Sequence, residues 1–313
     1  MCATKTTVIL LNYNNQIDTE ICIKSLKKYS PNLKIVVVDN NSTGNEIDIV
    51  CKKFNDITLL KNPTNIGFGR GNNIGIRWSL ENTKSKYILI LNNDTYVKDD
   101  SIGILENFMD NNSKIAGCSA RIVFAENPNV IWYGGGALNW KRGGAISDKM
   151  RKPFNGDLTN KKVDFITGCC MMIRLDFLKK IGGFDPRYFM YYEDVELCAR
   201  IKKNHGRLFF VPNSVIYHRV HGSIRKDHEK LDAILLPHLP FYIEHSFCNV
   251  LLTFTKYANN NEKIWGSMYL AIRWFRNIIV YIMNRRFEAI TALYRSVKRF
   301  FYFKKKIYYD ELS

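Results

Sequence analysis

The sequence predicts an α/β fold in which a mostly parallel central sheet is flanked by helices, followed by a basic, amphipathic helical region. Two observations predict this class: short apolar runs alternate with amphipathic segments in the first hundred residues, and polar clusters directly follow three of the runs. Hydrophobic residues make up 46% of the 313 residues, which allows a sizeable core and excludes a disordered chain. The expected strands are Thr7–Leu11, Lys34–Val38, Ile57–Leu60 and Tyr87–Leu91.

Amphipathic segments between these strands predict three helices, Asp18–Tyr29, Glu46–Phe54 and Gly71–Asn82, the first of which ends before Pro31. Residues 111–162 contain Gly134–Gly136 and Gly143-Gly144, so we expect irregular strands and mobile loops there. A later apolar run, Val163–Arg174, is consistent with a buried strand. We therefore expect a catalytic domain over residues 1–230 and a helical region over residues 231–313.

Aromatic and basic residues are mixed in the C-terminal region, where two amphipathic helices are expected. At 100° per residue, a polar arc of roughly 140° contains Lys263, Arg273, Arg276, Asn277 and Asn284. The opposite side consists mostly of apolar residues, namely Trp265, Met268, Tyr269, Ile272, Ile279 and Met283. Two interpretations stay open: the helices pack on the catalytic domain or on a second subunit, or they lie on an anionic membrane.

The charge balance favours an anionic partner. Lys and Arg number 46 and Asp and Glu 29, so the net charge is 46 − 29 = +17. Nucleic acid, phospholipid and phosphorylated substrates all fit such a chain.

Eight unevenly spaced cysteines indicate reduced core thiols, and no window of 18 residues is apolar without charge. The first residues lack the pattern of a secretory signal, so we expect a cytosolic start.

Two carboxylates lie at the ends of expected strands. Asp39 ends one strand, and Asp94 follows another together with Asn92 and Asn93. In open α/β sheets ligands bind beyond the carboxyl ends of the strands, where oxygen ligands suit a Mg²⁺ ion that bridges protein and phosphates. The alternatives are a turn role for Asp39 and a helix N-cap for Asp94.

A loop rich in Gly and Asn, residues 62–73, leads into an expected helix. Such a loop brings backbone N–H groups and a helix N-terminus close to an anion. The loop lacks the Lys-Ser/Thr ending of a P-loop and the Rossmann glycine spacing.

Adjacent carboxylates, Glu193-Asp194, follow several bulky residues at an expected helix start. A carboxylate beside apolar walls suits a general base, because desolvation raises its pKa toward the working pH. His218 ends an apolar run and is a candidate metal ligand, with a structural role as the alternative.

Together these segments resemble the family-2 glycosyltransferases with a GT-A fold, in particular the bacterial rhamnosyltransferase-like group. The resemblance covers roughly residues 6 to 225 and rests on several motifs in the family's order. These are Asn12-Tyr13-Asn14, Val38-Asp39-Asn40-Asn41-Ser42, Asn65-Ile66-Gly67-Phe68, Leu91-Asn92-Asn93-Asp94, Thr167-Gly168, Gly183-Phe184-Asp185 and Tyr192-Glu193-Asp194-Val195-Glu196-Leu197.

The resemblance implies a pocket for a nucleotide-diphosphate sugar. Asp39 would accept the N3–H of uracil or thymine, and Asp94 and His218 would hold Mg²⁺ or Mn²⁺. Asp94 matches the last acid of the family's Asp-X-Asp motif, whose first position is Asn92 here. The other implied pocket residues are Asn12, Tyr13, Asn14, Asn41, Asn65, Gly67, Phe68, Arg70, Asn73 and Asn93, and the acceptor side would include Gly168, Trp132 and Tyr192.

The implied reaction is an inverting displacement in which Asp194 takes the proton of an acceptor hydroxyl and Glu193 orients the acceptor or the base. The sequence does not decide which of these two neighbours is the base.

The first-choice donor is dTDP-rhamnose and the alternative is a UDP-hexose, namely UDP-glucose, UDP-galactose or UDP-GlcNAc. The implied acceptor is a saccharide or a polyprenyl-diphosphate-linked saccharide of cell-surface polysaccharide synthesis. We expect the enzyme in the cytoplasm, peripheral on the inner face of the cell membrane, either monomeric or as a homo-oligomer.

Two other classes of protein fit the sequence less well. A nucleic-acid-binding protein would use the +17 charge, but the expected site motifs are acidic or neutral and much of the basic signal lies after residue 231. A nucleotide-sugar-binding protein without catalysis would not need Glu193-Asp194. We therefore expect no nucleic-acid partner.

Overall fold

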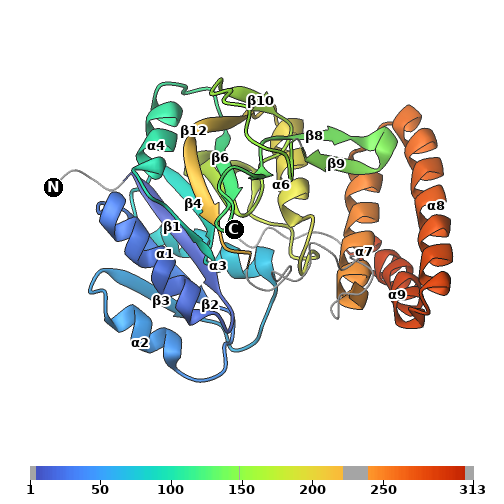
Figure 1. The fold of residues 1–313 in the computed structure, drawn as a ribbon, viewed down its shortest axis with the longest axis horizontal. Coiled ribbons are helices and arrows are strands. Elements are labelled where there is room, and N and C mark those ends of the chain that lie inside the picture. The colour runs from blue at the N-terminus through green and yellow to red at the C-terminus, as the bar shows by residue number, and fades with distance from the viewer. Residues whose placement is uncertain (1–4, 148, 221–238, 307–313) are drawn as a thin grey trace.

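The computed structural model describes residues 5–147, 149–220 and 239–306 (Figure 1). Strands and helices alternate in its first part as predicted. Helix α3 begins at Phe68 rather than at Gly71, because Gly67 is already its N-cap, so part of the predicted loop is the first helical turn. The elements are β1 (Thr6–Asn12), α1 (Gln16–Tyr29), β2 (Lys34–Asp39), α2 (Glu46–Lys52), β3 (Ile57–Lys61), α3 (Phe68–Asn82) and β4 (Tyr87–Asn92).

The middle of the chain is more regular than predicted. The expected irregularity is limited in β6 (Gly117–Phe124) to a register shift against β7 between Ile122 and Val123. β6 is otherwise an eight-residue strand inside the sheet, and its mixed sequence GCSARIVF hides its burial. The glycine pairs lie in and beside a hairpin, β8 (Gly136–Asn139) and β9 (Gly144–Ser147). The remaining elements are β5 (Thr95–Tyr96), α4 (Ser101–Asp110), β7 (Ile131–Tyr133), the 3₁₀ helix η1 (Trp140–Arg142) and β10 (Lys161–Val163).

The expected strand at Val163–Arg174 is shorter in the structure. Val163 is the last residue of β10, residues 164–169 form a loop that carries Thr167 and Gly168, and the strand β11 is Cys170–Arg174. Three further elements complete this part of the chain: α5 (Leu175–Ile181), α6 (Glu193–Lys203) and β12 (Leu208–His218). The predicted helix start at Glu193-Asp194 is confirmed.

All of these strands except β8 and β9, which form a separate two-stranded sheet, belong to one mixed, mostly parallel sheet. Its order is β10-β12-β6-β11-β4-β1-β2-β3, with β5 paired to β12 and β7 to β6. β1 to β4 run parallel, whereas β11 is antiparallel to β4 and β6. The start of β11 therefore lies at the edge of the sheet where β1, β2 and β4 end. The predicted α/β class with a mostly parallel sheet is confirmed.

Apolar side chains of the central strands are covered on both faces of the sheet. Val8, Ile35, Ile88 and Leu89 are fully buried, as expected for parallel strands between helical layers. The cysteines in the described residues are all free and buried, which confirms the prediction of reduced core thiols for Cys22, Cys51, Cys118, Cys169, Cys170, Cys198 and Cys248.

Three helices follow, α7 (Leu239–Tyr257), α8 (Asn260–Met283) and α9 (Phe287–Lys304). They lie beyond the β8–β9 hairpin, on the opposite side of the molecule from β3 and α2 (Figure 1). α7 was not among the predicted helices, and the predicted boundary at residues 230 and 231 lies outside the described residues. Over the ranges that the structure describes, no helix is long and apolar enough to cross a membrane.

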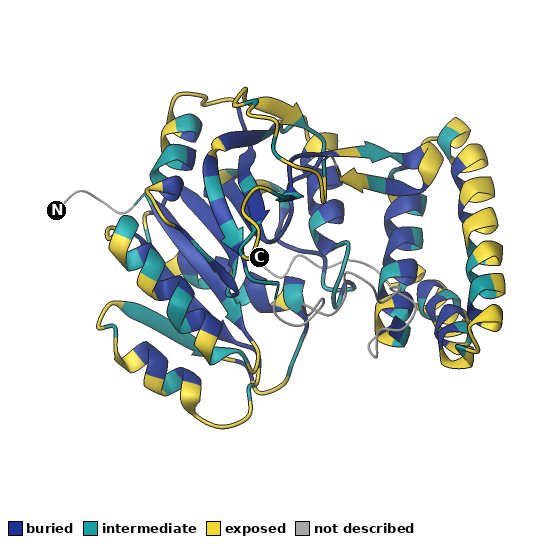
Figure 2. Ribbon diagram, in the orientation of Figure 1, coloured by how far each residue is buried: buried dark blue, intermediate teal, exposed yellow. Residues whose placement is uncertain are grey.

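Helix α8 has two apolar faces rather than one. It packs against the protein through Gly266, Leu270 and Tyr281, which are buried. The side predicted as apolar from the sequence is instead exposed, as Figure 2 shows along the outer side of α8. Both faces are apolar, so the sequence pattern did not indicate which one is buried.

Candidate active site

Asp39 is the last residue of β2, at the carboxyl edge of the sheet, and its carboxylate accepts hydrogen bonds from Asn12 and Ser42. The residue is only 5% exposed. Its Oδ1 accepts hydrogen bonds from Asn12 Nδ2 at 2.9 Å and from Ser42 Oγ at 2.5 Å, and its Oδ2 accepts from the Ser42 N–H at 3.2 Å. The turn role of Asp39 is therefore present and fixes the orientation of the carboxylate, and its contact with a base stays a prediction.

Neighbouring polar residues extend this arrangement toward β4. Asn93 Nδ2 donates to Thr19 Oγ1 at 2.8 Å and to Asn12 Oδ1 at 3.4 Å. Asn14, which has a left-handed backbone, accepts from the Thr43 N–H at 2.8 Å. Tyr13 and Asn41 are exposed beside it. The structure therefore brings these predicted pocket residues together along one edge of the sheet.

Asn40 lies beside the predicted pocket residues but was not one of them. It is 2% exposed. Its Nδ2 donates to Asn65 Oδ1 at 2.8 Å and to the Gly67 carbonyl at 3.2 Å, and its Oδ1 accepts from Asn62 Nδ2 at 3.0 Å. The available signal was its place inside the Val38–Ser42 motif. Asn40 links the β2 end to the loop before α3.

Gly67 brings that loop against the segment before α6. Its φ is +88°, and an added Cβ would lie 2.2 Å from the Phe189 carbonyl oxygen. The next residue, Phe68, donates its N–H to the same carbonyl at 2.8 Å. A glycine is required here both by the backbone conformation and by the close approach.

Two other predicted pocket residues lie on the first turns of α3. Asn73 is buried and forms two hydrogen bonds of 2.8 Å with the backbone N–H and C=O of Phe184. Asn73 therefore attaches the segment before α6 to α3, and a direct contact with nucleotide stays a prediction. Arg70 is exposed on the first turn of α3.

Asp94 and His218 meet where β5 pairs with β12, which places Thr95 opposite His218. His218 Nε2 lies 3.1 Å from Asp94 Oδ1, and the edge of the Trp132 ring lies against the imidazole with ring centroids 4.6 Å apart. His218 Nδ1 is buried and has no hydrogen-bond partner among the described residues.

This pair fits part of a divalent cation site. A carboxylate and an imidazole are both common metal ligands, and an unpartnered buried nitrogen is available for further contacts. In the part of the chain that the structure describes, no group of three or more His, Cys, Asp or Glu side chains could hold a metal ion. A cation at Asp94 and His218 would thus need additional ligands, such as the oxygens of a diphosphate.

Asp194 lies in the first turn of α6, against the loop that precedes β11. Its Oδ2 accepts from the Gly168 N–H at 2.9 Å and its Oδ1 accepts from the Val195 N–H at 2.8 Å. Burial raises the pKa of Asp194, and these backbone donors oppose that rise. The carboxylate is thereby held in one orientation while its basicity increases.

Glu193 has a different environment from its neighbour. It is 6% exposed, and its Oε2 has no hydrogen-bond partner among the residues described. Burial, and next the charge of Asp194, raise the pKa of Glu193 well above its usual range. Glu193 therefore holds a proton to a higher pH than an exposed glutamate does.

The turn before these carboxylates is strained. Tyr191 and Tyr192 both have φ of +69°, which non-glycine residues rarely adopt. Asn249 on α7 donates from Nδ2 to the carbonyls of Met190 and Tyr191, at 3.0 and 2.7 Å, and Tyr192 Oη accepts from the Ala145 N–H at 3.2 Å. The sequence analysis missed Asn249, because α7 carries no motif.

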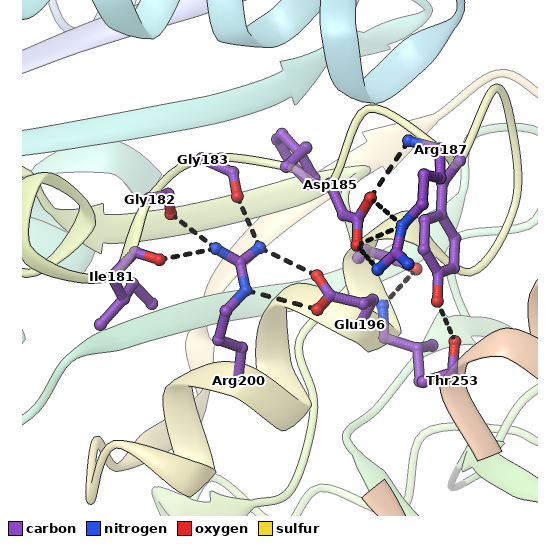
Figure 3. Close-up of polar contacts among 12 residues, drawn as sticks. Ile181, Gly182, Gly183, Asp185, Arg187, Glu196, Arg200 and Thr253 are labelled. Carbon is purple, nitrogen blue, oxygen red and sulfur yellow. Dashed lines mark hydrogen bonds and ion pairs between the residues drawn. The ribbon is translucent and has the colours of Figure 1, made fainter. Parts of the chain in front are cut away.

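A buried charge cluster connects the same segment to α6 and α7 (Figure 3). Glu196 has a fully buried side chain and accepts from Arg200 at 2.8 Å, from Lys256 at 2.7 Å and from Tyr257 Oη at 2.7 Å. Burial alone would raise the pKa of Glu196, but the charges of Arg200 and Lys256 outweigh it and lower the pKa to about 2.

Arg200 also donates to backbone carbonyls of the segment that leads to the strained turn, those of Ile181, Gly182 and Gly183. Asp185 pairs with Arg187 in the same segment. Within the quoted motifs, Asp185 and Glu196 therefore have structural roles, whereas Glu193 and Asp194 lie at the candidate site.

Comparison with known proteins agrees with this geometry. The family model described as Glycosyl transferase family 2 matches residues 7–182, and the model described as N-terminal domain of galactosyltransferase matches residues 158–222. The "Low-salt glycan biosynthesis hexosyltransferase Agl10" of Haloferax volcanii is 31% identical over 199 residues, which are 63% of this chain and 61% of that protein.

Two similar proteins are rhamnosyltransferases. The "Rhamnosyltransferase WbbL" of Escherichia coli is 24% identical over 231 residues, 70% of this chain and 84% of that protein. The "N-acetylglucosaminyl-diphospho-decaprenol L-rhamnosyltransferase" of Mycobacterium tuberculosis is 36% identical over 76 residues, 24% of this chain and 25% of that protein.

Solved structures share the fold. The mannosyltransferase PcManGT of Pyrobaculum calidifontis, in complex with GDP-Man and Mn²⁺, matches with a TM-score of 0.58 at 12% identity. The match covers 97% of this chain and 88% of that chain. GalNAc-T7 with UDP, GalNAc and Mn²⁺ matches with a TM-score of 0.60 at 16% identity. The match covers 81% of this chain and 48% of that chain. The expected GT-A architecture is thereby confirmed.

Proposed function

We propose that this chain, which belongs to glycosyl transferase family 2, transfers a sugar from a nucleotide-diphosphate donor to a hydroxyl group of a saccharide acceptor in cell-surface polysaccharide synthesis. One observation carries the proposal: the carboxyl edge of the sheet brings together an oriented carboxylate at Asp39, the Asp94–His218 pair and a partly desolvated carboxylate at Asp194. These are the parts needed to bind a base, hold a diphosphate and accept a proton.

The donor we favour is dTDP-rhamnose, with a UDP-hexose as the alternative. Asp39 would accept the N3–H of a thymine or uracil base, and it does not distinguish these two bases. The names of the E. coli and M. tuberculosis relatives support a rhamnosyl donor. The name of the Haloferax relative supports the broader class of hexosyl donors.

Asp194 is the residue we assign as the base of an inverting displacement. It would take the proton of the acceptor hydroxyl as that oxygen attacks the anomeric carbon and the nucleoside diphosphate departs from the opposite face. Its raised pKa makes it a better proton acceptor, and the N–H groups of Gly168 and Val195 hold it in position. Glu193, whose pKa burial raises well above its usual range, would orient the acceptor as a hydrogen-bond donor.

A divalent cation, Mg²⁺ or Mn²⁺, would be held by Asp94 and His218. When bound, it would supply positive charge that stabilises the departing diphosphate. The solved structures of similar fold that contain Mn²⁺ support this assignment.

The acceptor we favour is a saccharide linked to polyprenyl diphosphate, at the inner face of the cell membrane. The name of the M. tuberculosis relative supports this class. The Gly168 N–H donates to Asp194, and Tyr192 is the N-cap residue of α6, two positions before Asp194, so both are suited to line the acceptor side. Trp132 packs on His218 instead and would lie between the acceptor and the diphosphate.

The experiment that tests the function is a transfer assay with matched variants of the two adjacent carboxylates. Asp194→Asn should lower the turnover number by about 10³-fold, a typical contribution of a general base, with nearly unchanged affinity for the nucleotide. Glu193→Gln keeps a hydrogen-bond donor and should retain most of the activity. Near-normal turnover of Asp194→Asn would contradict the assigned base, and no transfer by the wild type from any pyrimidine nucleotide sugar would contradict the function.

A further inference from the structure

The outer face of α8 is a continuous apolar surface that the protein does not cover. Each side chain of this surface is 42–77% exposed. We call it the α8 stripe, and it consists of Ile264, Trp265, Met268, Tyr269, Ile272, Phe275, Ile279, Ile282 and Met283. Soluble proteins rarely expose a contiguous apolar patch of this kind without a binding partner.

Helix geometry shows that the stripe is directed away from the protein. At 100° per residue, all of its members except Tyr269 fall within an arc of about 100°. The buried residues Gly266, Leu270 and Tyr281 lie on roughly the opposite side. Repacking of α8 on its own neighbours would therefore bury one face at the cost of exposing the other.

Arginines flank the stripe. Arg273 and Arg276 are exposed, and on the helical wheel they lie next to its Tyr269 edge. Residues 260–306, which span α8 and α9, contain 11 Lys and Arg and 2 Asp and Glu, a net charge of 11 − 2 = +9. Any partner of the stripe must thus accept apolar side chains with Arg273 and Arg276 at their edge, on a part of the chain that has an excess of positive charge.

We infer that the α8 stripe docks on the surface of an anionic phospholipid bilayer. The apolar residues would enter the boundary of the acyl chains, with Trp265 and Tyr269 at headgroup level and Arg273 and Arg276 at the lipid phosphates. A second copy of the chain is a poorer partner, because each copy would bring the same +9 region to the interface. Charge complementarity therefore favours the bilayer.

Docking through α8 would bring the catalytic turn close to the membrane. Leu270, on the buried face of α8, packs at Gly143, where an added Cβ would lie 2.5 Å from its side chain. The neighbouring Ala145 donates to Tyr192 Oη, next to Glu193 and Asp194. The β8–β9 hairpin thus connects the docking helix to the turn that carries the proposed base. This consequence, unlike the docking itself, rests on the proposed function.

The test is vesicle co-sedimentation of the full chain in about 0.1 M salt. The vesicles contain either equal amounts of phosphatidylglycerol and phosphatidylcholine or phosphatidylcholine alone. The variant Ile272→Ser/Phe275→Ser removes apolar contacts from the stripe without a change in charge. Its matched control is Ile49→Ser on α2, an isoleucine that is 53% exposed in the sheet region.

We expect the wild type and Ile49→Ser to bind the anionic vesicles equally, and the stripe variant to bind at least about tenfold more weakly. Unchanged sugar transfer to a soluble acceptor would show that the stripe variant is folded. Equal binding by the stripe variant would overturn the inference, since charge alone would then explain the binding. Absence of vesicle binding, together with a dimer that Ile272→Ser/Phe275→Ser dissociates, would identify a second copy as the partner. Vesicle binding requires no nucleotide, so its failure is distinguishable from failure of the proposed function.

Discussion

The sheet region and the C-terminal helices depart from ordinary burial in opposite ways. At the carboxyl edge of the sheet, the polar side chains of Asn12, Asp39 and Asn40 are almost completely buried. Asn12 donates a hydrogen bond to Asp39, and Asn40 donates to Asn65. On α8, large apolar side chains such as Ile272 and Phe275 are exposed. Buried polar groups and exposed apolar patches are the informative exceptions to burial rules. The first lies at the proposed ligand site, and the second is the proposed docking surface.

The two regions are nevertheless joined at the strained turn. Asn249 on α7 holds the carbonyls of Met190 and Tyr191, and Lys256 on α7 pairs with Glu196 on α6. α7, which packs against the helix that bears the proposed docking surface, thus also contacts the segment that carries Glu193 and Asp194. The two surfaces therefore differ in chemistry, but the regions that carry them are joined by these contacts and are not independent folding units.

The largest effect is expected when the charge of Glu196 is removed, because Glu196 joins α6 to Lys256 on α7. Glu196→Gln leaves Arg200 and Lys256 without their buried carboxylate, so the free energy of unfolding should fall by about 3–5 kcal/mol in urea denaturation. The control is Glu244→Gln, which removes a partly exposed ion pair to Arg295 and should cost less than about 1 kcal/mol. Equal losses in the two variants would argue against a buried cluster as the main attachment of α7.

A smaller effect is expected for Asn249→Leu, which removes both hydrogen bonds to the strained turn at similar side-chain size. The turnover number should fall by about 10- to 100-fold, because a displacement of the proposed base by about 1 Å costs that much. The Michaelis constant for the donor should not change, since the two hydrogen bonds of Asn249 Nδ2 go to the turn before Glu193 and not to the predicted nucleotide-binding residues.

The control for that prediction is Thr253→Val, one turn farther along α7. It removes the hydrogen bond to Tyr188 Oη at 2.8 Å and leaves the carbonyls of Met190 and Tyr191 bonded. A fall in turnover for Thr253→Val as large as that for Asn249→Leu would show a general loss of helix packing and not a positioning role.

The smallest predicted effect concerns pH. Because the pKa of Glu193 is raised in the folded state, the unfolded chain loses this proton first as the pH rises above the usual carboxyl range. The free energy of unfolding should therefore decrease between about pH 5 and about pH 8, by about 1–2 kcal/mol more in the wild type than in Glu193→Gln. Urea denaturation at both pH values measures the difference, and Glu81→Gln on an exposed part of α3 serves as the control. Identical pH dependence in the wild type and Glu193→Gln would contradict the buried, proton-holding glutamate.

Most of the sheet region could be predicted, because its strands combine apolar runs with polar ends. The positions of Asp39, Asp94 and Asp194 follow from this pattern and from the order of the motifs. β6 was not predicted as a regular strand, since its mixed sequence has no clear period of two although most of its residues are buried.

The contribution of α7 could not be predicted. Asn249 acts through two backbone carbonyls that lie about sixty positions earlier in the chain, so only the tertiary structure reveals it. The orientation of α8 was ambiguous for a similar reason. A helix with apolar residues on two faces carries no sequence information about which face meets the protein.

The most direct test of the central claim is calorimetric titration of the full chain with dTDP, UDP and ADP, each with Mn²⁺ and again with EDTA. The account predicts that a pyrimidine nucleotide binds with Mn²⁺ and much more weakly with EDTA, and that ADP does not bind. Absence of binding for all three nucleotides would contradict a nucleotide-sugar site at the carboxyl edge of the sheet.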